Sequence, residues 1–186
     1  MIRFFSALAL TAAMVMPAQA LKVNGVDVAD GINLDNQKLV LNGAGVRSKF
    51  FVDAYIAALY LPAKSTDANA VIEGDETMAI RLQITSGMIN SKRMSDSTRD
   101  GFVRSTGGNL APIEKEVDQL ISAFKDEIKE GDIFDLVYSP EQGVTVSHNG
   151  VQKSQVQGFE FKKALFGIWL SDDSIQKSLR KAMLSN

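Results

Sequence analysis

The chain of 186 residues contains no cysteine and a single histidine, His148. Without cysteine it folds without disulfides, and cysteine-based metal sites and cysteine nucleophiles are excluded. One histidine gives little support to a histidine-rich metal site or a Ser-His-Asp triad. We expect His148 at the end of a strand, before the turn Asn149-Gly150. We therefore expect neither a metal nor another cofactor.

A hydrophobic run long enough to cross a membrane is also missing from the N-terminus. The apolar stretch from Phe4 to Met16 is shorter than the roughly 20 residues that span a bilayer. Arg3 precedes it and Ala18-Gln19-Ala20 follows it, which is typical of a secretory signal peptide. We expect residues 1–20 to be removed, residues 21–186 to form one domain, and the mature chain to be periplasmic. Leu21 stands where a lipoprotein has cysteine, so we expect no lipid anchor and no membrane span.

Neither sign of charge dominates the chain. It has 20 Lys and Arg against 22 Asp and Glu, a formal charge of −2. This balance gives little support to nucleic acid or an anionic membrane as a partner. A phosphate-binding loop is lacking too, because Gly43-Ala44-Gly45 has neither its length nor its lysine. Asp172 and Asp173 are expected at a helix N-terminus rather than at a metal.

Two-residue alternation and turn signals predict the strands. Asn24-Gly25 and Asn149-Gly150 are hairpin turns, because Asn-Gly tolerates the positive φ angles of a tight turn. The expected strands are 21–23, 26–28, 38–41, 52–61, 78–85, 133–138, 144–148 and 151–156.

Helical spacing of apolar residues predicts four helices. They cover Met88–Ser105, a segment from Pro112 to a stop near Gly131, Phe159–Leu170, and a last helix that Ser171 caps. The order is strands, helices, strands, helices. It favours an α+β domain with helices packed on an antiparallel sheet over alternating βαβ units.

The most informative segment is Leu41–Pro62, where glycines lead to the lone Arg47 and then to an apolar strand with Tyr55. An unpaired buried charge is costly, so Arg47 must face an anion or water. An internal carboxylate, Asp53 or Glu160, or a sheet edge would also satisfy Arg47. Tyr55 is equally well explained as a core residue.

This segment resembles the chalcone isomerase superfamily, specifically its branch of bacterial secreted chalcone isomerase-like proteins. Gly43-Ala44-Gly45-Val46-Arg47 is close to the glycine-arginine motif of the plant enzymes, and Tyr55–Leu61 is similar to the strand that lines the ligand cleft. The resemblance continues through 78–85, 91–102 and 161–179. It implies an open-faced β-sandwich, a large antiparallel sheet covered by a helical layer, with the ligand held between them.

The resemblance implies two roles for Arg47 and Tyr55. Arg47 corresponds to the arginine that handles the substrate phenolate in the isomerases and grips a carboxylate in the plastid fatty-acid-binding relatives. Tyr55 corresponds to a catalytic threonine in the isomerases and to a carboxylate-binding tyrosine in the fatty-acid binders.

The remaining positions depart from the isomerase pattern. Met94, Gly101 and Ala164 stand where the isomerases have a tyrosine, an asparagine and a threonine, and Leu165 follows Ala164. Loss of one donor typically costs roughly 10²–10³ in rate, so this pattern favours binding over catalysis. We expect these residues to line an apolar slot for a fatty-acid-like or other amphipathic anion.

Two other functions stay open. One is an intramolecular lyase or isomerase acting on a chalcone-like enone, with Arg47 as its electrostatic catalyst. The other is a structural or interaction module of the cell envelope. Six large apolar side chains are candidates either for an acyl slot or for the core: Phe50, Phe51, Met88, Phe102, Phe161 and Phe166. Trp169 is expected in the core.

Overall fold

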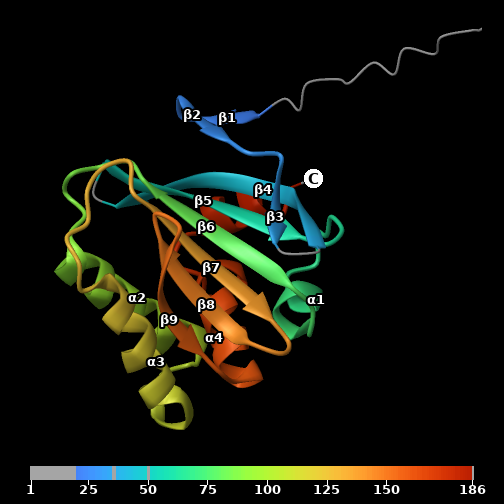
Figure 1. The fold of residues 1–186 in the computed structure, drawn as a ribbon, viewed down its shortest axis with the longest axis vertical. Helices are drawn as coiled ribbons and strands as arrows, with labels where there is room; N and C mark the ends of the chain where they lie inside the picture. The colour runs from blue at the N-terminus through green and yellow to red at the C-terminus, as the bar shows by residue number, and fades with distance from the viewer. Residues whose placement is uncertain (1–19, 35–36, 50, 186) are drawn as a thin grey trace, which may run out of the picture.

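The described part of the chain is organised around one large antiparallel sheet (Figure 1). The structure is a computed structural model and describes residues 20–34, 37–49 and 51–185. Most of the expected signal peptide, and Phe50, lie outside the described residues. Within them, seven strands follow one another in the order β3-β4-β5-β6-β7-β8-β9. Their bounds are β3 Gly31–Leu34, β4 Gln37–Lys49, β5 Val52–Leu61, β6 Met78–Ile84, β7 Ile133–Ser139, β8 Gly143–His148 and β9 Val151–Val156.

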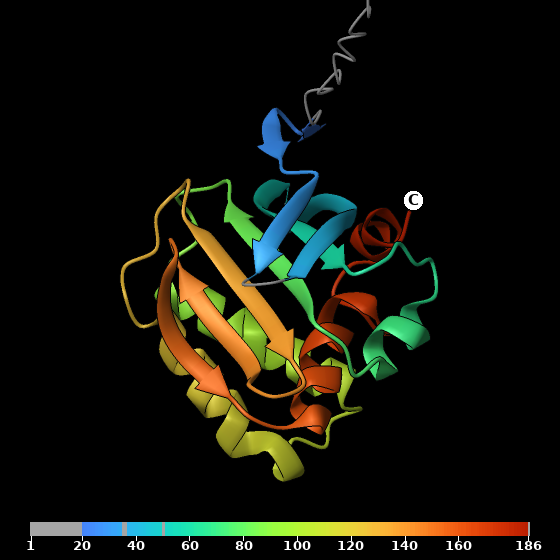
Figure 2. The same cartoon turned by 45° about the vertical axis from the view of Figure 1, so that its right-hand side comes forward.

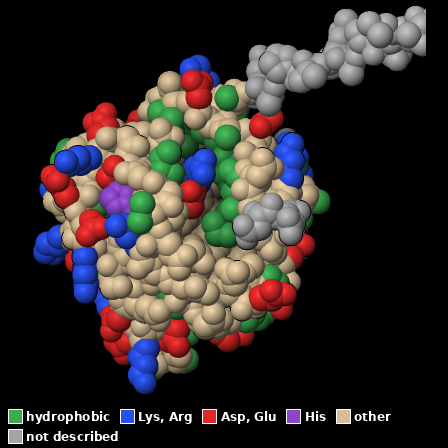
Figure 3. Space-filling model, in the orientation of Figure 1, with side chains coloured by type: hydrophobic (Ala, Val, Ile, Leu, Met, Phe, Trp, Pro, Cys, Tyr) green, Lys and Arg blue, Asp and Glu red, His purple; other side chains and the backbone are tan. Residues whose placement is uncertain are grey.

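A short hairpin, β1 (Leu21–Val23) and β2 (Val26–Val28), precedes the sheet. Its turn residues Asn24 and Gly25 have φ angles of 48° and 83°, the left-handed geometry expected of Asn-Gly. A small apolar cluster, including Val28 of β2, packs on the outer face of the sheet. In Figure 3, seen as in Figure 1, hydrophobic side chains gather in the upper middle of the surface, with a basic and an acidic side chain among them.

Helices cover the other face of the sheet, as Figures 1 and 2 show. The main core lies between this face and the helices. α4 is predominantly apolar and most of its side chains are buried. The helical segments are α1 Ala68–Glu73, α2 Ser91–Ser105, η1 Ala111–Ile113, α3 Glu114–Ile121, η2 Ser122–Phe124, α4 Phe159–Leu170 and α5 Lys177–Met183. The expected α+β fold, a large antiparallel sheet covered by a helical layer, is confirmed.

Three expectations about helix ends were wrong. The helix expected from Met88 begins only at Ser91, after the N-cap residue Asn90. The helix that begins after Pro112 ends in a 3₁₀ turn at Phe124, not near Gly131, and Ile128 is buried from a segment without regular structure. Ser171 ends α4 instead of capping the next helix, and α5 begins only after Gln176.

Asp172 and Asp173 consequently do not lie at a helix N-terminus. Asp172 accepts a hydrogen bond from Arg180 of α5 at 2.9 Å, and Asp173 accepts one from Arg104 of α2 at 3.3 Å. These two carboxylates thus connect the end of α4 to two other helices.

The glycines before Arg47 lie inside β4, where they let α5 approach the strand backbone. A Cβ atom at Gly43 would lie 2.3 Å from the carbonyl oxygen of Ala182, and one at Gly45 would lie 2.7 Å from the Ala182 Cβ. The buried Asn42 side chain fixes the same contact, because its amide nitrogen donates to the carbonyl of Met183 at 2.8 Å. The glycine-rich segment therefore lets the C-terminal helix α5 pack directly against β4. We call this contact of Gly43 and Gly45 with α5 the glycine seat.

Lys162 of α4 is fully buried and joins α4 to α1. Its ammonium donates to the carbonyl oxygens of Val71, Ile72 and Gly74 at 2.6–2.9 Å, which satisfies the end of α1. The rings of three aromatic residues lie 5.4–5.5 Å from the nitrogen: Tyr138, Phe159 and Phe166. None of the described helices has the length and hydropathy needed to cross a membrane.

Candidate functional site

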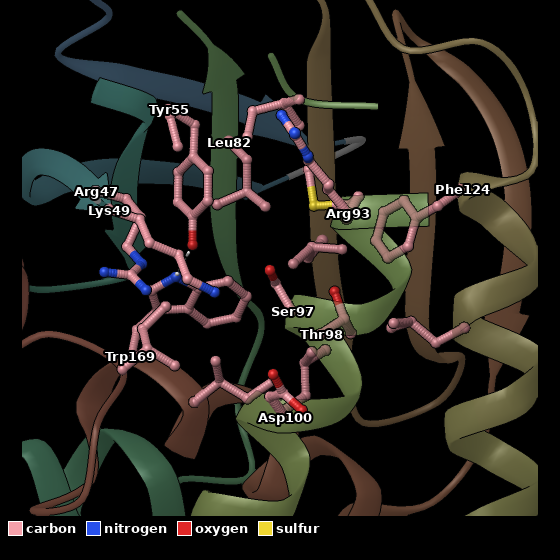
Figure 4. A pocket seen from close by; sticks show the side chains of 18 of the residues that line it. Arg47, Lys49, Tyr55, Leu82, Arg93, Ser97, Thr98, Asp100, Phe124 and Trp169 are labelled. Carbon is pink, nitrogen blue, oxygen red and sulfur yellow. Dashed lines mark hydrogen bonds between the residues drawn. The ribbon is translucent and has the colours of Figure 1, made fainter. Parts of the chain in front are cut away.

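Strand pairing brings Arg47 and Tyr55 together. They are register partners across β4 and β5, and a β-bulge follows between Arg47 and Ser48. Register partners in adjacent strands project to the same side of a sheet. In Figure 4 both side chains point to the same cavity from these strands.

The partners of the Arg47 guanidinium are neutral. Nη1 donates to the carbonyl of Ser48 at 2.8 Å and to Oε1 of Gln176 at 3.0 Å. Gln176 is held by the same strand, since its Oε1 accepts from the Ser48 amide at 3.0 Å and its Nε2 donates to the carbonyl of Val46 at 3.1 Å. Gln176 thus fixes the arginine without neutralising it.

The two carboxylates considered as internal partners of Arg47 are engaged elsewhere. Asp53 accepts hydrogen bonds from the Ser48 hydroxyl at 2.7 Å and from Asn24 at 2.9 Å. Glu160 pairs with Lys163 at 2.9 Å. Among the described residues no carboxylate forms an ion pair with Arg47, so its positive charge is available to a ligand.

Tyr55 is buried and keeps its proton. Burial raises the pKa of its phenol, while the hydrogen bond from Trp169 and the charge of Arg47 act in the opposite direction. The indole nitrogen of Trp169 donates to the Tyr55 oxygen at 3.1 Å, as the dashed line in Figure 4 marks. Because that oxygen already accepts, its own hydrogen is free to donate to a ligand acceptor.

A cavity of about 200 Å³ lies between the sheet and the helices at Arg47 and Tyr55. Four of its lining residues are basic and one is acidic: Arg47, Lys49, Arg93 and Arg104, with Asp100. Hydroxyl groups come from Ser97 and Thr98 of α2. The apolar lining consists of Ala54, Leu82, Ile89, Met94, Leu120, Phe124, Leu136, Leu165, Ile168, Trp169 and Ile175. One space thus combines a cationic, hydrogen-bonding part with an apolar part.

The structure brings four of the six predicted site residues to this cavity. Arg47, Tyr55, Met94 and Leu165 line it, whereas Gly101 and Ala164 do not. Gly101 serves helix packing instead: a Cβ there would lie 2.8 Å from a methyl group of Ile168. Ala164 is buried in the main core.

The described candidates for an acyl slot, four phenylalanines and Met88, do not line the cavity. Phe102, Phe161 and Phe166 are buried core residues, as their alternative interpretation predicted. Phe51 is fully exposed, and Met88 is 51% exposed. The slot is lined mainly by aliphatic side chains instead.

Trp169 and Gln176 were missed as site residues by sequence reasoning. Trp169 was assigned to the core from its apolar helix, and nothing in the sequence pattern marked Gln176. Both lie more than 110 residues from their partners along the chain. The described residues contain no cluster of three or more acidic or histidine side chains that would hold a metal.

Comparison with known proteins gives a consistent picture of the fold. A family model described as chalcone isomerase-like matches residues 20–185. The crystal structure of a fatty-acid binding protein from Arabidopsis thaliana is similar, with a TM-score of 0.68 and 19% sequence identity, covering 92% of this chain and 95% of that chain. A search of curated proteins found no match.

Proposed function

The chain belongs to the chalcone isomerase-like family, and from that premise we propose that it is a non-catalytic binding protein for a fatty-acid-like or other amphipathic anion. The observation that carries the proposal is the Arg47 guanidinium, which reaches a partly apolar cavity while its own partners are neutral. A half-buried cation without a carboxylate partner favours an anionic ligand, because an opposite charge offsets the cost of its partial desolvation.

Arg47 and Tyr55 would hold the head group. A guanidinium offers a carboxylate two parallel hydrogen bonds, and the Tyr55 hydroxyl adds a third. Trp169 keeps the phenol oriented by occupying its oxygen, and Gln176 keeps the guanidinium in place. This arrangement favours a carboxylate over a neutral head group such as an alcohol or an ester.

The apolar lining would hold the tail, and the cavity volume sets its length. If a methylene takes about the volume of a liquid water, ~30 Å³, then the cavity of about 200 Å³ holds at most roughly seven methylenes, and fewer once the head group occupies its cationic part. Burial of the tail then contributes at most about 6 kcal/mol gross at ~0.8 kcal/mol per methylene, and association offsets half or more of it. The charged hydrogen bonds add about 1.5–3 kcal/mol each, which makes micromolar affinity feasible. We therefore propose a medium chain as the best fit.

Several positions argue against catalysis. Met94 lines the cavity with a thioether where the resemblance implies a catalytic tyrosine. Gly101 and Ala164 lie outside the lining and offer no donor. The fold similarity to a fatty-acid binding protein supports the same conclusion.

We propose a periplasmic location on the basis of the signal-peptide pattern in residues 1–20. Fractionation of cells that express the full chain tests it. Intact mass spectrometry of the periplasmic fraction should show a protein that begins at Leu21.

Trp169 is the single tryptophan of the chain and lines the cavity, so its fluorescence reports on ligand binding directly. Mature protein should be titrated with saturated fatty acids of increasing length, and its organic extract analysed by mass spectrometry. We expect micromolar affinity for medium chains. Arg47→Ala should weaken it at least tenfold, since a charge-assisted hydrogen bond is worth about 1.5–3 kcal/mol.

Arg99→Ala is the matched control, because Arg99 lies on α2, pairs with Asp118 and does not line the cavity. It should bind fatty acids like the wild type. A wild-type protein with no extractable ligand and no fatty-acid affinity would refute the proposal. Turnover of a chalcone, lost in Arg47→Ala, would replace it with an isomerase function.

A further inference from the structure

One end of the sheet presents two exposed apolar side chains beside the cavity. The β4–β5 turn contains Phe51, and the segment between β6 and α2 contains Met88. These two segments are neighbours, because Thr85 donates through its amide to the carbonyl of Ala54 at 3.1 Å and through its hydroxyl to that of Asp53 at 3.0 Å. Figures 1 and 2 show them side by side.

Phe51 combines an exposed aromatic side chain with an unusual backbone conformation. Its side chain is fully exposed, and its backbone has φ 64°, the left-handed region that a bulky residue rarely adopts. Strained positions of this kind concentrate at functional sites. Met88 is 51% exposed in the neighbouring segment. Together they place an aromatic ring and a flexible thioether at one end of the sheet. Among the described residues, the other exposed large apolar side chains are Leu21, Val103 and Val151.

Two basic residues connect these apolar side chains to the cavity. Lys49 ends β4 two residues before Phe51, and Arg93 lies in the first turn of α2. Arg93 donates to the carbonyl of Met88 at 2.6 Å, which holds its guanidinium beside that residue. Both Lys49 and Arg93 also line the cavity. We call Lys49, Phe51, Met88 and Arg93 the mouth surface.

We propose that the mouth surface docks the protein on an anionic phospholipid membrane. Exposed apolar side chains insert at the boundary of head groups and acyl chains, and basic side chains bind anionic head groups. The net charge of −2 does not oppose this contact, because charges beyond the Debye length of about 10 Å are screened at the surface. Docking would bring the cavity next to the bilayer, and the use of this contact for ligand exchange rests on the proposed function. The docking itself does not depend on the proposed function.

The other side of the same end of the sheet is unsuited to an anionic membrane. Val151, the first residue of β9, is 59% exposed, but three strands separate β9 from β5. The acidic segment 126–132 lies beside it, because Asp126 pairs with Lys153 of β9 at 2.8 Å. Docking is therefore expected through the β4–β5 side only. Val151 supplies a matched apolar control.

The test is flotation of the mature protein with vesicles of equal parts phosphatidylglycerol and phosphatidylcholine. We expect binding at 0.1 M NaCl that falls about tenfold or more in pure phosphatidylcholine, because each basic residue near the surface contributes about 1 kcal/mol. Phe51→Asn should reduce partitioning about tenfold through the lost apolar contact. Asparagine tolerates the left-handed backbone, so this variant should melt at or above the wild-type temperature. Val151→Ser should bind vesicles within twofold of the wild type.

Three results would overturn the docking proposal: no flotation of the wild type, equal flotation of Phe51→Asn and wild type, or an equal loss in Val151→Ser. Fatty-acid titration of Phe51→Asn in solution separates this proposal from the previous one, because Phe51 does not line the cavity. Unchanged fatty-acid affinity with lost flotation supports both. Phe51-dependent flotation of a wild type that binds no fatty acid leaves docking standing and removes the proposed function.

Discussion

The buried ammonium of Lys162 predicts an unusual dependence of stability on pH. Burial lowers the pKa of Lys162 to about 8, against the opposing charges of Asp75, Glu73 and Glu76. In the unfolded chain the same group titrates near its ordinary value of 10.5. Between these two values the unfolded state carries a proton that the folded state has lost, so the free energy of unfolding rises with pH.

The size of the rise follows from the two pKa values. At pH 7 both states hold the proton and the effect is absent. At pH 9.5 the folded amine is almost fully neutral, and linkage gives a gain of about 2 kcal/mol. Above pH 10 the sign reverses. Burial and the hydrogen bond to Asp75 raise the pKa of Tyr138 to about 12, so the stability it contributes is lost as pH rises from 10 to 12.

Urea unfolding at constant ionic strength, followed by Trp169 fluorescence at pH 7 and pH 9.5, measures this rise. Lys162→Met should abolish the difference between the two pH values. Lys163→Met is the matched control: it changes the next residue of α4, whose pKa its hydrogen bond to Glu160 raises, and the difference should persist. A wild-type stability that is flat or falls between pH 7 and 9.5 would show that the carbonyl oxygens around Lys162 fully offset its burial, which would refute the reasoning.

Two further substitutions test the seat of the C-terminal helix and the tyrosine of the site. Gly43→Ala should destabilise the protein by about 1–3 kcal/mol in urea unfolding, because its new Cβ meets the backbone oxygen of Ala182. Gly87→Ala has open space and should leave stability within ~0.5 kcal/mol; equal effects at both positions would contradict the seat. Tyr55→Phe leaves the Trp169 indole without its acceptor and should cost about 1–3 kcal/mol of stability and a similar amount of ligand affinity. Unchanged titration curves for this variant would remove Tyr55 from the head-group site.

The sequence predicted strongly patterned elements to the residue and missed the weakly patterned ones. The strand Val151–Val156 follows an Asn-Gly turn, and the helix Phe159–Leu170 is a strongly apolar segment, so both were predicted with the observed bounds. The strand Gly31–Leu34 and the helix Ala68–Glu73 were missed, because four and six residues carry too little periodicity. The helix after Pro112 was predicted to be too long because Ile128 continues the helical spacing of apolar residues. In the structure Ile128 is buried, but it lies in an irregular segment.

The candidate site was predicted only in part, because the sequence signals are local and the contacts of the site are not. Arg47 and Tyr55 lie in one hairpin, so a local pattern and a family resemblance found both. Trp169 and Gln176 reach them from the far end of the chain, through contacts that only tertiary packing creates. Gly101 was assigned to the ligand by alignment alone, whereas its lack of a side chain serves the approach of α2 to α4.

The glycine seat in β4 couples the cation of the candidate site to the packing of α5. Gly43 and Gly45 admit α5 to the strand, and Gln176, directly before α5, holds the Arg47 guanidinium. A local opening that lifts α5 from β4 therefore also releases the side chain that positions this cation. The rigidity of a helix on the sheet thus sets the orientation of a charge at the cavity.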